Sequence, residues 1–276
     1  MRQGDSLQKP NHLDLTDLRT LVACPTCRGR LELSAGEPAL CAACGLRFRP
    51  LPYSWDLRPS GAFQNGEIWK AWEVLQANGV ASYENAPDRN LGVGERAEYL
   101  GFSDFAQFHG TVLDIGCGPQ SWPTHFNRHA PGTRFVGVDP LVGGSSAEYT
   151  QVCGLAEALP FRDGAFHQTV FATSLDHLVD PAQALSEAGR VVRPGGTVEI
   201  FMGEKHPDAP RPAASPSWYQ KLERPPGAYD VFHIKRFTVD DAEALFDEGG
   251  FQMIAHERVS VDEFRALHFF KLAPPS

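Results

Sequence analysis

The sequence predicts an α/β protein built on a doubly wound parallel sheet, with a small cysteine-rich module at its N-terminus. Three observations lead to this prediction. From residue 110 onward, short apolar runs alternate with helical stretches. Two closely spaced cysteine pairs fall within residues 21–60, ahead of that alternation. The 276 residues include 42% hydrophobic and 21% charged residues, a composition that supports a buried core.

Charge and cysteine usage narrow the class of protein. The formal net charge is −9; residues 1–60 carry eight Lys/Arg against six Asp/Glu, or +2, which leaves −11 for the remainder. So acidic a remainder disfavours a broad surface for nucleic acid or anionic lipid. The sequence has no run of 18 apolar residues and its start has no apolar signal region, so we expect neither a membrane span nor secretion. Clustered cysteines favour a reducing, cytoplasmic location over a disulfide framework.

The N-terminal module has the cysteine spacing of a metal site. Residues 1–20 are predicted to be a polar lead with a short helix at 13–18, and residues 21–60 a zinc ribbon and linker. Two C-x2-C pairs are separated by thirteen residues. Four convergent thiolates satisfy tetrahedral zinc, and an all-sulfur ligand set is typical of a structural site. So short a segment cannot bury a stable core unaided. We therefore predict structural Zn²⁺ bound by Cys24, Cys27, Cys41 and Cys44.

Residues 61–276 are predicted to form the main domain. An amphipathic helix is expected at 65–78, with an aromatic stripe that serves as a packing face. Strands are predicted at 111–115, 134–138, 149–152, 167–172 and 197–202. A helix at 181–192 precedes the fifth strand, with 193–196 as a turn between them; a helix at 239–248 and strands at 251–259 and 264–272 close the chain. Residues 205–228 form a Pro-rich insert that is expected to be either a disordered loop or a lid over a site.

The first predicted strand runs into a glycine turn. In Asp114-Ile115-Gly116-Cys117-Gly118, the two glycines let the backbone approach a ligand closely. The second strand ends at Asp139, whose carboxylate can accept both ribose hydroxyls of an adenosine. Ser121 replaces the third glycine of a dinucleotide fingerprint, and Asp114 suits a cationic ligand better than a pyrophosphate. These residues favour S-adenosylmethionine, which carries a sulfonium and an amino group and has no phosphate.

Four motifs resemble those of class I S-adenosylmethionine-dependent methyltransferases and occur in that family's order between residues 110 and 255. They are the glycine turn, Asp139, Ala156-Glu157-Ala158-Leu159-Pro160-Phe161 and Val191-Val192-Arg193-Pro194-Gly195-Gly196. The resemblance implies a Rossmann-like fold and methyl transfer. It places the methionine moiety on the turn, the ribose on Asp139 and the adenine beside Ala156 and Glu157. The family often has an acidic residue where Leu155 stands. The cofactor-binding residues expected are Asp114, Gly116, Cys117, Gly118, Asp139, Pro140, Ala156, Glu157 and Thr173.

The candidate catalytic residues follow the fourth predicted strand and the Pro-rich insert. Methyl transfer depends on alignment, and a base is needed only if the acceptor loses a proton during attack. His177 is the best candidate base because imidazole titrates near neutrality; its alternative role is to cap or pack the following helix. Asp176 is expected to orient a substrate hydroxyl or to cap that helix. His233 reaches the site if the insert folds over it. The catalytic candidates are therefore His177, Asp176 and His233.

Three functions are compatible with the sequence. The acidic main domain and the aromatic, Pro-rich insert favour a small organic acceptor, methylated on oxygen or nitrogen. A zinc ribbon followed by this domain also occurs in large-subunit ribosomal RNA guanine-N1 methyltransferases, so by resemblance RNA is the leading rival substrate. The third possibility is a non-catalytic S-adenosylmethionine-binding partner subunit. Neither the acceptor nor the oligomeric state follows from the sequence.

Overall fold

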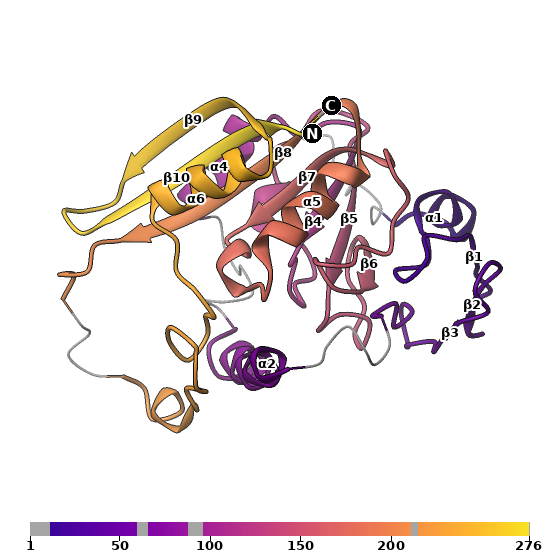
Figure 1. The fold of residues 1–276 in the computed structure, drawn as a ribbon, viewed down its shortest axis with the longest axis horizontal. Helices are drawn as coiled ribbons and strands as arrows, with labels where there is room; N and C mark the ends of the chain where they lie inside the picture. The colour runs from indigo at the N-terminus through magenta and orange to yellow at the C-terminus, as the bar shows by residue number, and fades with distance from the viewer. Residues whose placement is uncertain (1–11, 60–65, 88–95, 211–214, 276) are drawn as a thin grey trace, which may run out of the picture.

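A seven-stranded sheet forms the centre of the protein, seen in a computed structural model that describes residues 12–59, 66–87, 96–210 and 215–275 (Figure 1). The strand order is β6-β5-β4-β7-β8-β10-β9. The strands are β4 (Thr111–Ile115), β5 (Arg134–Asp139), β6 (Thr150–Cys153), β7 (Phe166–Ala172), β8 (Val192–Lys205), β9 (Gln252–Ser260) and β10 (Arg265–Ala273). The helices of this part are α2 (Glu67–Asn85), α4 (Ala97–Ala106), α5 (Pro181–Val191) and α6 (Val239–Glu248), with 3-10 turns η1 (Thr124–Phe126), η2 (Leu175–His177) and η3 (Tyr219–Lys221).

The Rossmann-like fold is confirmed, and the sheet is mixed where the alternation of strands and helices indicated a parallel one. β6, β5, β4, β7 and β8 are parallel, whereas β10 pairs antiparallel with both β8 and β9. Only four residues join β9 to β10, and so short a connection can return the chain only as a hairpin. The predicted turn at 193–196 instead lies within β8, as a bulge between the pairs Phe166↔Val192 and Gln168↔Thr197.

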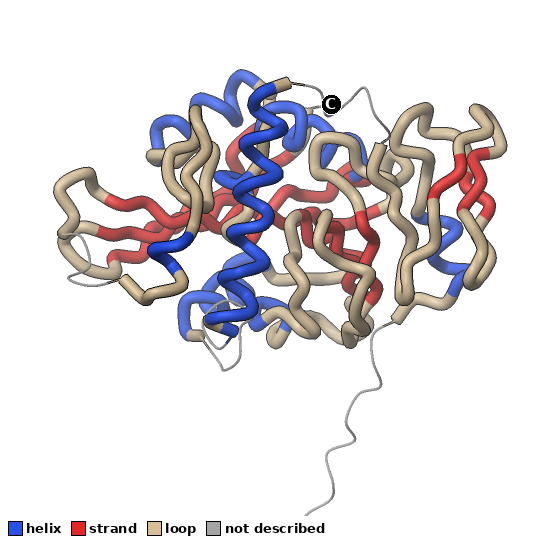
Figure 2. The backbone as a smooth tube through the Cα atoms, turned by 90° about the horizontal axis from the view of Figure 1, so that it is seen from below, coloured by secondary structure: helices blue, strands red, loops and turns tan. Residues whose placement is uncertain are grey.

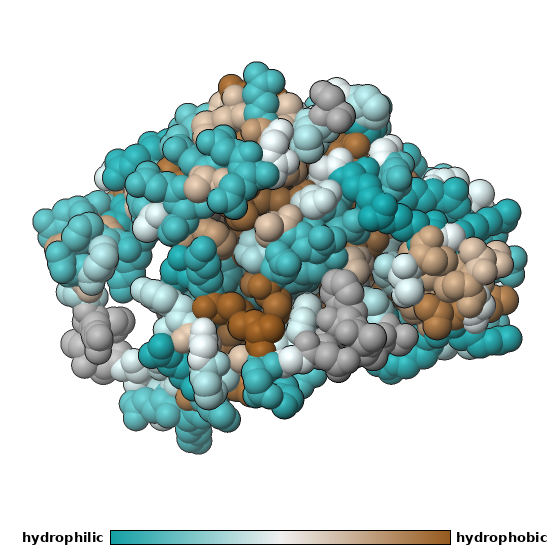
Figure 3. Space-filling model, in the orientation of Figure 1, coloured by the Kyte–Doolittle hydropathy of each residue, from teal (hydrophilic) through white to brown (hydrophobic). Residues whose placement is uncertain are grey.

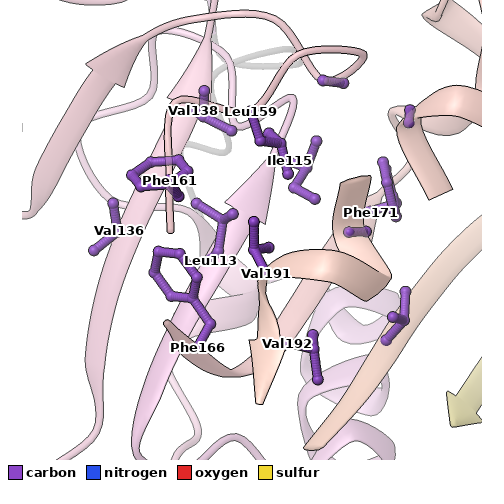
Figure 4. Packing of buried hydrophobic residues seen from close by; sticks show 14 of the residues in the cluster. Leu113, Ile115, Val136, Val138, Leu159, Phe161, Phe166, Phe171, Val191 and Val192 are labelled. Atoms are coloured by element: carbon purple, nitrogen blue, oxygen red, sulfur yellow. The ribbon is translucent and has the colours of Figure 1, made fainter. Parts of the chain in front are cut away.

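The central parallel strands are buried along almost their whole length because both faces are covered. All five residues of β4 and five of the six in β5 are buried. Helix α5 begins at Pro181, where the Asp180 side chain accepts from the Gln183 N–H, and it buries one stripe of residues on the sheet. Figure 4 shows this core, which includes Leu113, Ile115, Val136, Val138, Phe161, Phe166, Phe171 and Val191.

The N-terminal module packs directly on the sheet domain. It consists of α1 (Leu15–Leu21) and a three-stranded antiparallel sheet of β1 (Leu31–Glu32), β2 (Ala39–Cys41) and β3 (Arg47–Phe48). Main-chain bonds join the two parts: the Ala23 N–H donates to the Pro160 carbonyl at 2.9 Å, and the Leu57 N–H of the linker donates to the Cys153 carbonyl at 2.8 Å, covering the edge of β6. The buried side chains of the module belong to the same cluster as those of the sheet. The two parts therefore share one core.

Helix α2 runs across the molecule below the ends of the strands (Figures 1 and 2). It is longer than the helix predicted at 65–78, and α4 was not predicted at all. Trp69, Trp72 and Leu75 of α2 are buried, and both tryptophans pack against Leu155. Within the described ranges, no helix combines the length and the apolar character needed to cross a bilayer.

Candidate active site

A cavity of about 700 Å³ lies at the carboxyl ends of β4, β5 and β7, where α2 covers it. Trp72 and Leu75 of α2 form part of its wall, so the predicted packing face is also a wall of the site. Trp218 and Tyr219 of the Pro-rich insert line it as well. The face of the molecule seen in Figure 3 is mostly hydrophilic, with an apolar patch in its lower half. Every predicted cofactor-binding residue lines this cavity: Asp114, Gly116, Cys117, Gly118, Asp139, Pro140, Ala156, Glu157 and Thr173.

The glycine turn requires glycine for steric reasons. Gly116 has a φ of 77°, and a Cβ there would lie 2.5 Å from the Cβ of Ser174. Gly118 has a φ of 61°, and a Cβ there would lie 3.0 Å from the Tyr83 hydroxyl. Both conformations are left-handed, which L side chains rarely adopt. The turn therefore brings bare backbone to the cavity wall.

Asp139 ties the turn to the end of β5. Its Oδ2 accepts from the Gly118 N–H at 3.0 Å, and its Oδ1 accepts from the Leu141 N–H at 2.8 Å. Burial raises the pKa of Asp139 to about 6, and these two N–H donors oppose the rise. The carboxylate is thus held in one orientation at the cavity wall, and it is ionised at neutral pH.

Asp114 places a second buried carboxylate on the wall. Its Oδ2 lies 3.0 Å from Nε2 of the buried His125 on η1. Its Oδ1 has no hydrogen-bond partner within the described residues. A buried, unpartnered acceptor beside a cavity is a position for a ligand donor, such as an ammonium group.

The side chain of Glu157, which also lines the cavity, is engaged within the protein. Its Oε1 accepts from the N–H groups of Val179, at 2.9 Å, and Asp180, at 3.3 Å. Burial raises the pKa of Glu157. The carboxylate therefore fixes the segment that leads into α5, and Ala156 and Leu155 form the apolar part of this wall.

The three predicted catalytic residues lie together. The rings of His177 and His233 have centroids 4.3 Å apart, and Nε2 of each lies 3.7 Å from a carboxylate oxygen of Asp176. Both histidines line the large cavity, whereas Asp176 lines only an adjoining cavity of about 190 Å³. Asp176 does not cap α5, because Asp180 does so. Its Oδ2 instead accepts from Arg236 at 2.8 Å.

His177 is fixed by the segment that follows the insert. Its Nδ1 lies 3.0 Å from the Phe232 carbonyl, the geometry of a donated hydrogen bond. Burial lowers the pKa of His177, so its ring is neutral at neutral pH. His206, at the start of the Pro-rich insert, is exposed.

The four predicted zinc ligands converge in the N-terminal module. Their Sγ atoms lie within 4.8 Å of one another, with Cys24 and Cys44 at 3.8 Å and Cys27 and Cys41 at 3.5 Å. Burial raises the pKa of Cys41, but the N–H groups of Cys44 and Ala43 outweigh it and lower that pKa to about 7. Tetrahedral zinc with bonds of about 2.3 Å would place its sulfurs about 3.8 Å apart. The cluster has the dimensions of such a site.

Several residues at this site were not predicted from the sequence. Tyr83 and Tyr99 come from α2 and α4, and His125 comes from the 3-10 turn η1. Asp230 and Arg236 flank His233 at intervals of three residues. That spacing is visible in the sequence, but only the folded chain brings all three to the cavity.

Residues 113–200 match a family model described as a methyltransferase domain. This region of the chain is a methyltransferase domain. The match covers the glycine turn, Asp139 and the start of β8, in agreement with the cavity built around them.

Most of the curated relatives match only part of the chain. An uncharacterized methyltransferase of Mycobacterium sp. (strain KMS) is 35% identical over 94 residues, which cover 31% of this chain and 36% of that protein. The chain thus spans about a third of the length of the first relatives it matches. The ubiquinone/menaquinone biosynthesis C-methyltransferase UbiE of Methylobacterium nodulans is 26% identical, over 71% of this chain and 78% of that one.

Solved structures support the fold. The 1,6-didemethyltoxoflavin-N1-methyltransferase of Burkholderia thailandensis superposes with a TM-score of 0.52 and 18% identity. The superposition covers 87% of this chain and all of that one. At this identity the likeness establishes the Rossmann-like methyltransferase fold and nothing finer.

Proposed function

We propose that this protein transfers the methyl group of S-adenosylmethionine to a small organic acceptor, on oxygen or nitrogen. The observation that carries the proposal is one cavity lined on one side by the glycine turn and Asp139, and on the other by His177 and His233. Its volume of about 700 Å³ matches sites for small molecules. The matched family supplies the reaction type, and relatives named for quinone methylation are compatible with a small acceptor.

The residues present fit S-adenosylmethionine. A Cβ at Gly116 or Gly118 would clash with Ser174 or crowd Tyr83, so bare backbone faces the cavity where the methionine part is expected. The unpartnered Oδ1 of Asp114 suits the ammonium group, and the ionised Asp139 suits the ribose hydroxyls. Leu155 and Ala156 offer an apolar surface for the adenine. In this proposal the side chain of Glu157 has a structural role.

One assay distinguishes the proposed function from the two alternatives. It combines the protein and labelled S-adenosylmethionine with either the small-molecule fraction or the RNA of a cell extract. The label in each fraction is then counted. We expect label in small molecules. Label confined to RNA would establish the rival ribosomal RNA function, which the −11 charge of residues 61–276 disfavours. S-adenosylmethionine binding without transfer to either fraction would indicate a non-catalytic partner subunit.

Affinity for S-adenosylhomocysteine should depend on pH through Asp139. The ribose hydroxyls donate to the ionised carboxylate, so binding competes with protonation of a group whose pKa is about 6. Affinity should be constant above about pH 7 and fall as pH decreases through 6, by up to about tenfold per pH unit. Calorimetry across this range measures it. Asp139→Asn should bind weakly with a flat profile, and a flat profile in the unaltered protein would contradict the role of Asp139.

We further propose that the four-cysteine cluster binds Zn²⁺ in a structural role. The sulfur separations support this proposal, and with all four ligands from protein no position is left open for a substrate. When bound, the metal would hold the two C-x2-C turns together. The module would thereby brace α1 and the linker against the edge of β6.

A further inference from the structure

We propose that His233, oriented by Asp230, removes a proton from the acceptor, and that the methylated group is therefore a hydroxyl. This inference rests on the proposed methyl transfer and deepens it by naming the acceptor group. His233 lines both the large cavity and the smaller one beside it, and its side chain is only 10% exposed. It lies where the site of the nucleoside meets the space left for an acceptor.

Asp230 fixes the tautomer of His233. Its Oδ1 accepts from the Nδ1 of His233 at 2.7 Å, and also from the N–H groups of Phe232, at 2.8 Å, and His233, at 2.9 Å. Burial raises the pKa of Asp230, but the side-chain hydrogen bond with His233, the N–H of Phe232 and the charge of Arg236 hold it well below its ordinary value. The carboxylate is thus ionised and can only accept, so Nδ1 carries the proton and Nε2 carries the lone pair.

The neighbouring charged groups leave Nε2 available to a substrate. Asp176 lies 3.7 Å away, beyond hydrogen-bond distance, and Arg236 already balances its charge. His177 lies against the His233 ring, but its Nδ1 is bound to the Phe232 carbonyl and burial keeps it neutral. It therefore does not repel a proton that arrives on His233. Asp230 stabilises the imidazolium that forms, as carboxylate–histidine pairs do in hydrolases.

The chemistry of attack selects a hydroxyl. A neutral amine attacks with its lone pair and loses its proton afterwards, whereas a neutral hydroxyl is a weak nucleophile until its proton is taken. Here the hydroxyl proton passes to Nε2 of His233 while the oxygen bonds to the methyl carbon. The carbon–sulfur bond breaks and its electron pair stays on sulfur. The products are a methyl ether, S-adenosylhomocysteine and an imidazolium, which returns its proton to water.

The smaller cavity suits the body of such an acceptor. It has about 190 Å³ and combines apolar walls with the polar groups around His233. Leu175, Phe201, Met202 and Phe237 supply the apolar side. A ring or short apolar chain that bears a hydroxyl fits this division.

The test uses S-adenosylmethionine labelled with ¹³C in its methyl group and the small-molecule fraction of a cell extract. Carbon NMR of the products distinguishes methyl on oxygen, nitrogen and carbon. We expect an O-methyl product. We also expect that His233→Asn lowers the rate at neutral pH by at least about 100-fold. Affinity for S-adenosylhomocysteine and the unfolding temperature, measured in parallel, should stay unchanged. The control His109→Asn should keep the full rate, because His109 is exposed at the opposite end of β4.

Asp230→Asn tests the positioning role separately. An amide oxygen can still accept from the two backbone N–H groups, so the turn is retained while the charge is lost. The rate should fall at least tenfold and the acid limb of its pH profile should move to lower pH. Nitrogen NMR of histidine-labelled protein should find Nδ1 protonated in neutral His233.

The possible outcomes distinguish a failure of this inference from a failure of the proposed methyl transfer. An N-methyl or C-methyl product, a full rate in His233→Asn, or activity that requires added divalent metal would overturn the assignment of His233 while methyl transfer stands. Absence of labelled product from both the small-molecule and RNA fractions would overturn the proposed transferase itself.

Discussion

Replacing Asp139 by Asn is expected to weaken binding of S-adenosylhomocysteine by about 100-fold or more. The carboxylate would accept from two ribose hydroxyls, and hydrogen bonds to a charged group contribute about 1.5–3 kcal/mol each. In the unaltered protein the N–H groups of Gly118 and Leu141 each donate to a carboxylate oxygen of Asp139. Asn offers only one oxygen, so its NH₂ group would face one of these two N–H donors. The glycine turn would lose a contact together with the ribose.

Titration calorimetry with S-adenosylhomocysteine measures this effect without knowledge of the acceptor. Asp240→Asn, on the exposed first turn of α6, is the matched control and should bind normally. Undiminished affinity in Asp139→Asn would mean that the nucleoside lies elsewhere.

The double change Cys41→Ser and Cys44→Ser is expected to remove zinc and destabilise the whole chain. Structural zinc sites contribute about 10–16 kcal/mol of apparent binding free energy to folding. Because Leu18, Val22 and Leu31 belong to the same core cluster as Leu113 and Phe161, loosening the module disturbs the sheet as well. The unfolding temperature should fall by more than about 10 °C.

Zinc content measured by atomic absorption, together with thermal unfolding, tests this expectation. Cys153→Ser changes a buried thiol outside the cluster and should keep one zinc per chain. Affinity for S-adenosylhomocysteine should be largely retained at temperatures where the variant is folded. A double variant with full zinc content, or with unaltered stability, would contradict a structural metal.

Most of the sheet could be predicted because burial on both faces leaves a simple pattern. β4 is predicted to the residue, and the turn after it is marked by glycines that no other residue can replace without a clash. Residues 193–196 were predicted as a turn before the strand, whereas they lie within β8, because a strand that loops out and resumes looks like a turn in sequence. The hairpin of β9 and β10 was predicted as strands, but pairing direction depends on the length of the connection.

The site was predictable where one local motif supplies the residues and not where distant segments meet. Asp114, Gly116 and Gly118 are placed by a single strand end. Asp230 and Arg236 can be recognised as site residues only from their contacts with His233 and Asp176. Arg236 and Asp176 are 60 residues apart in the chain. Glu157 illustrates the converse, since its motif indicates ligand binding while its carboxylate holds the backbone of Val179 and Asp180.

If the four-cysteine cluster binds zinc as proposed, the common core of the cysteine module and the sheet would link the supply of this trace metal to the lifetime of the enzyme. A chain made when zinc is scarce would leave Leu18, Val22 and the edge of β6 uncovered. Such surfaces are recognised by proteases and chaperones. The amount of catalyst in the cell would then follow metal nutrition, even though the metal takes no part in the chemistry.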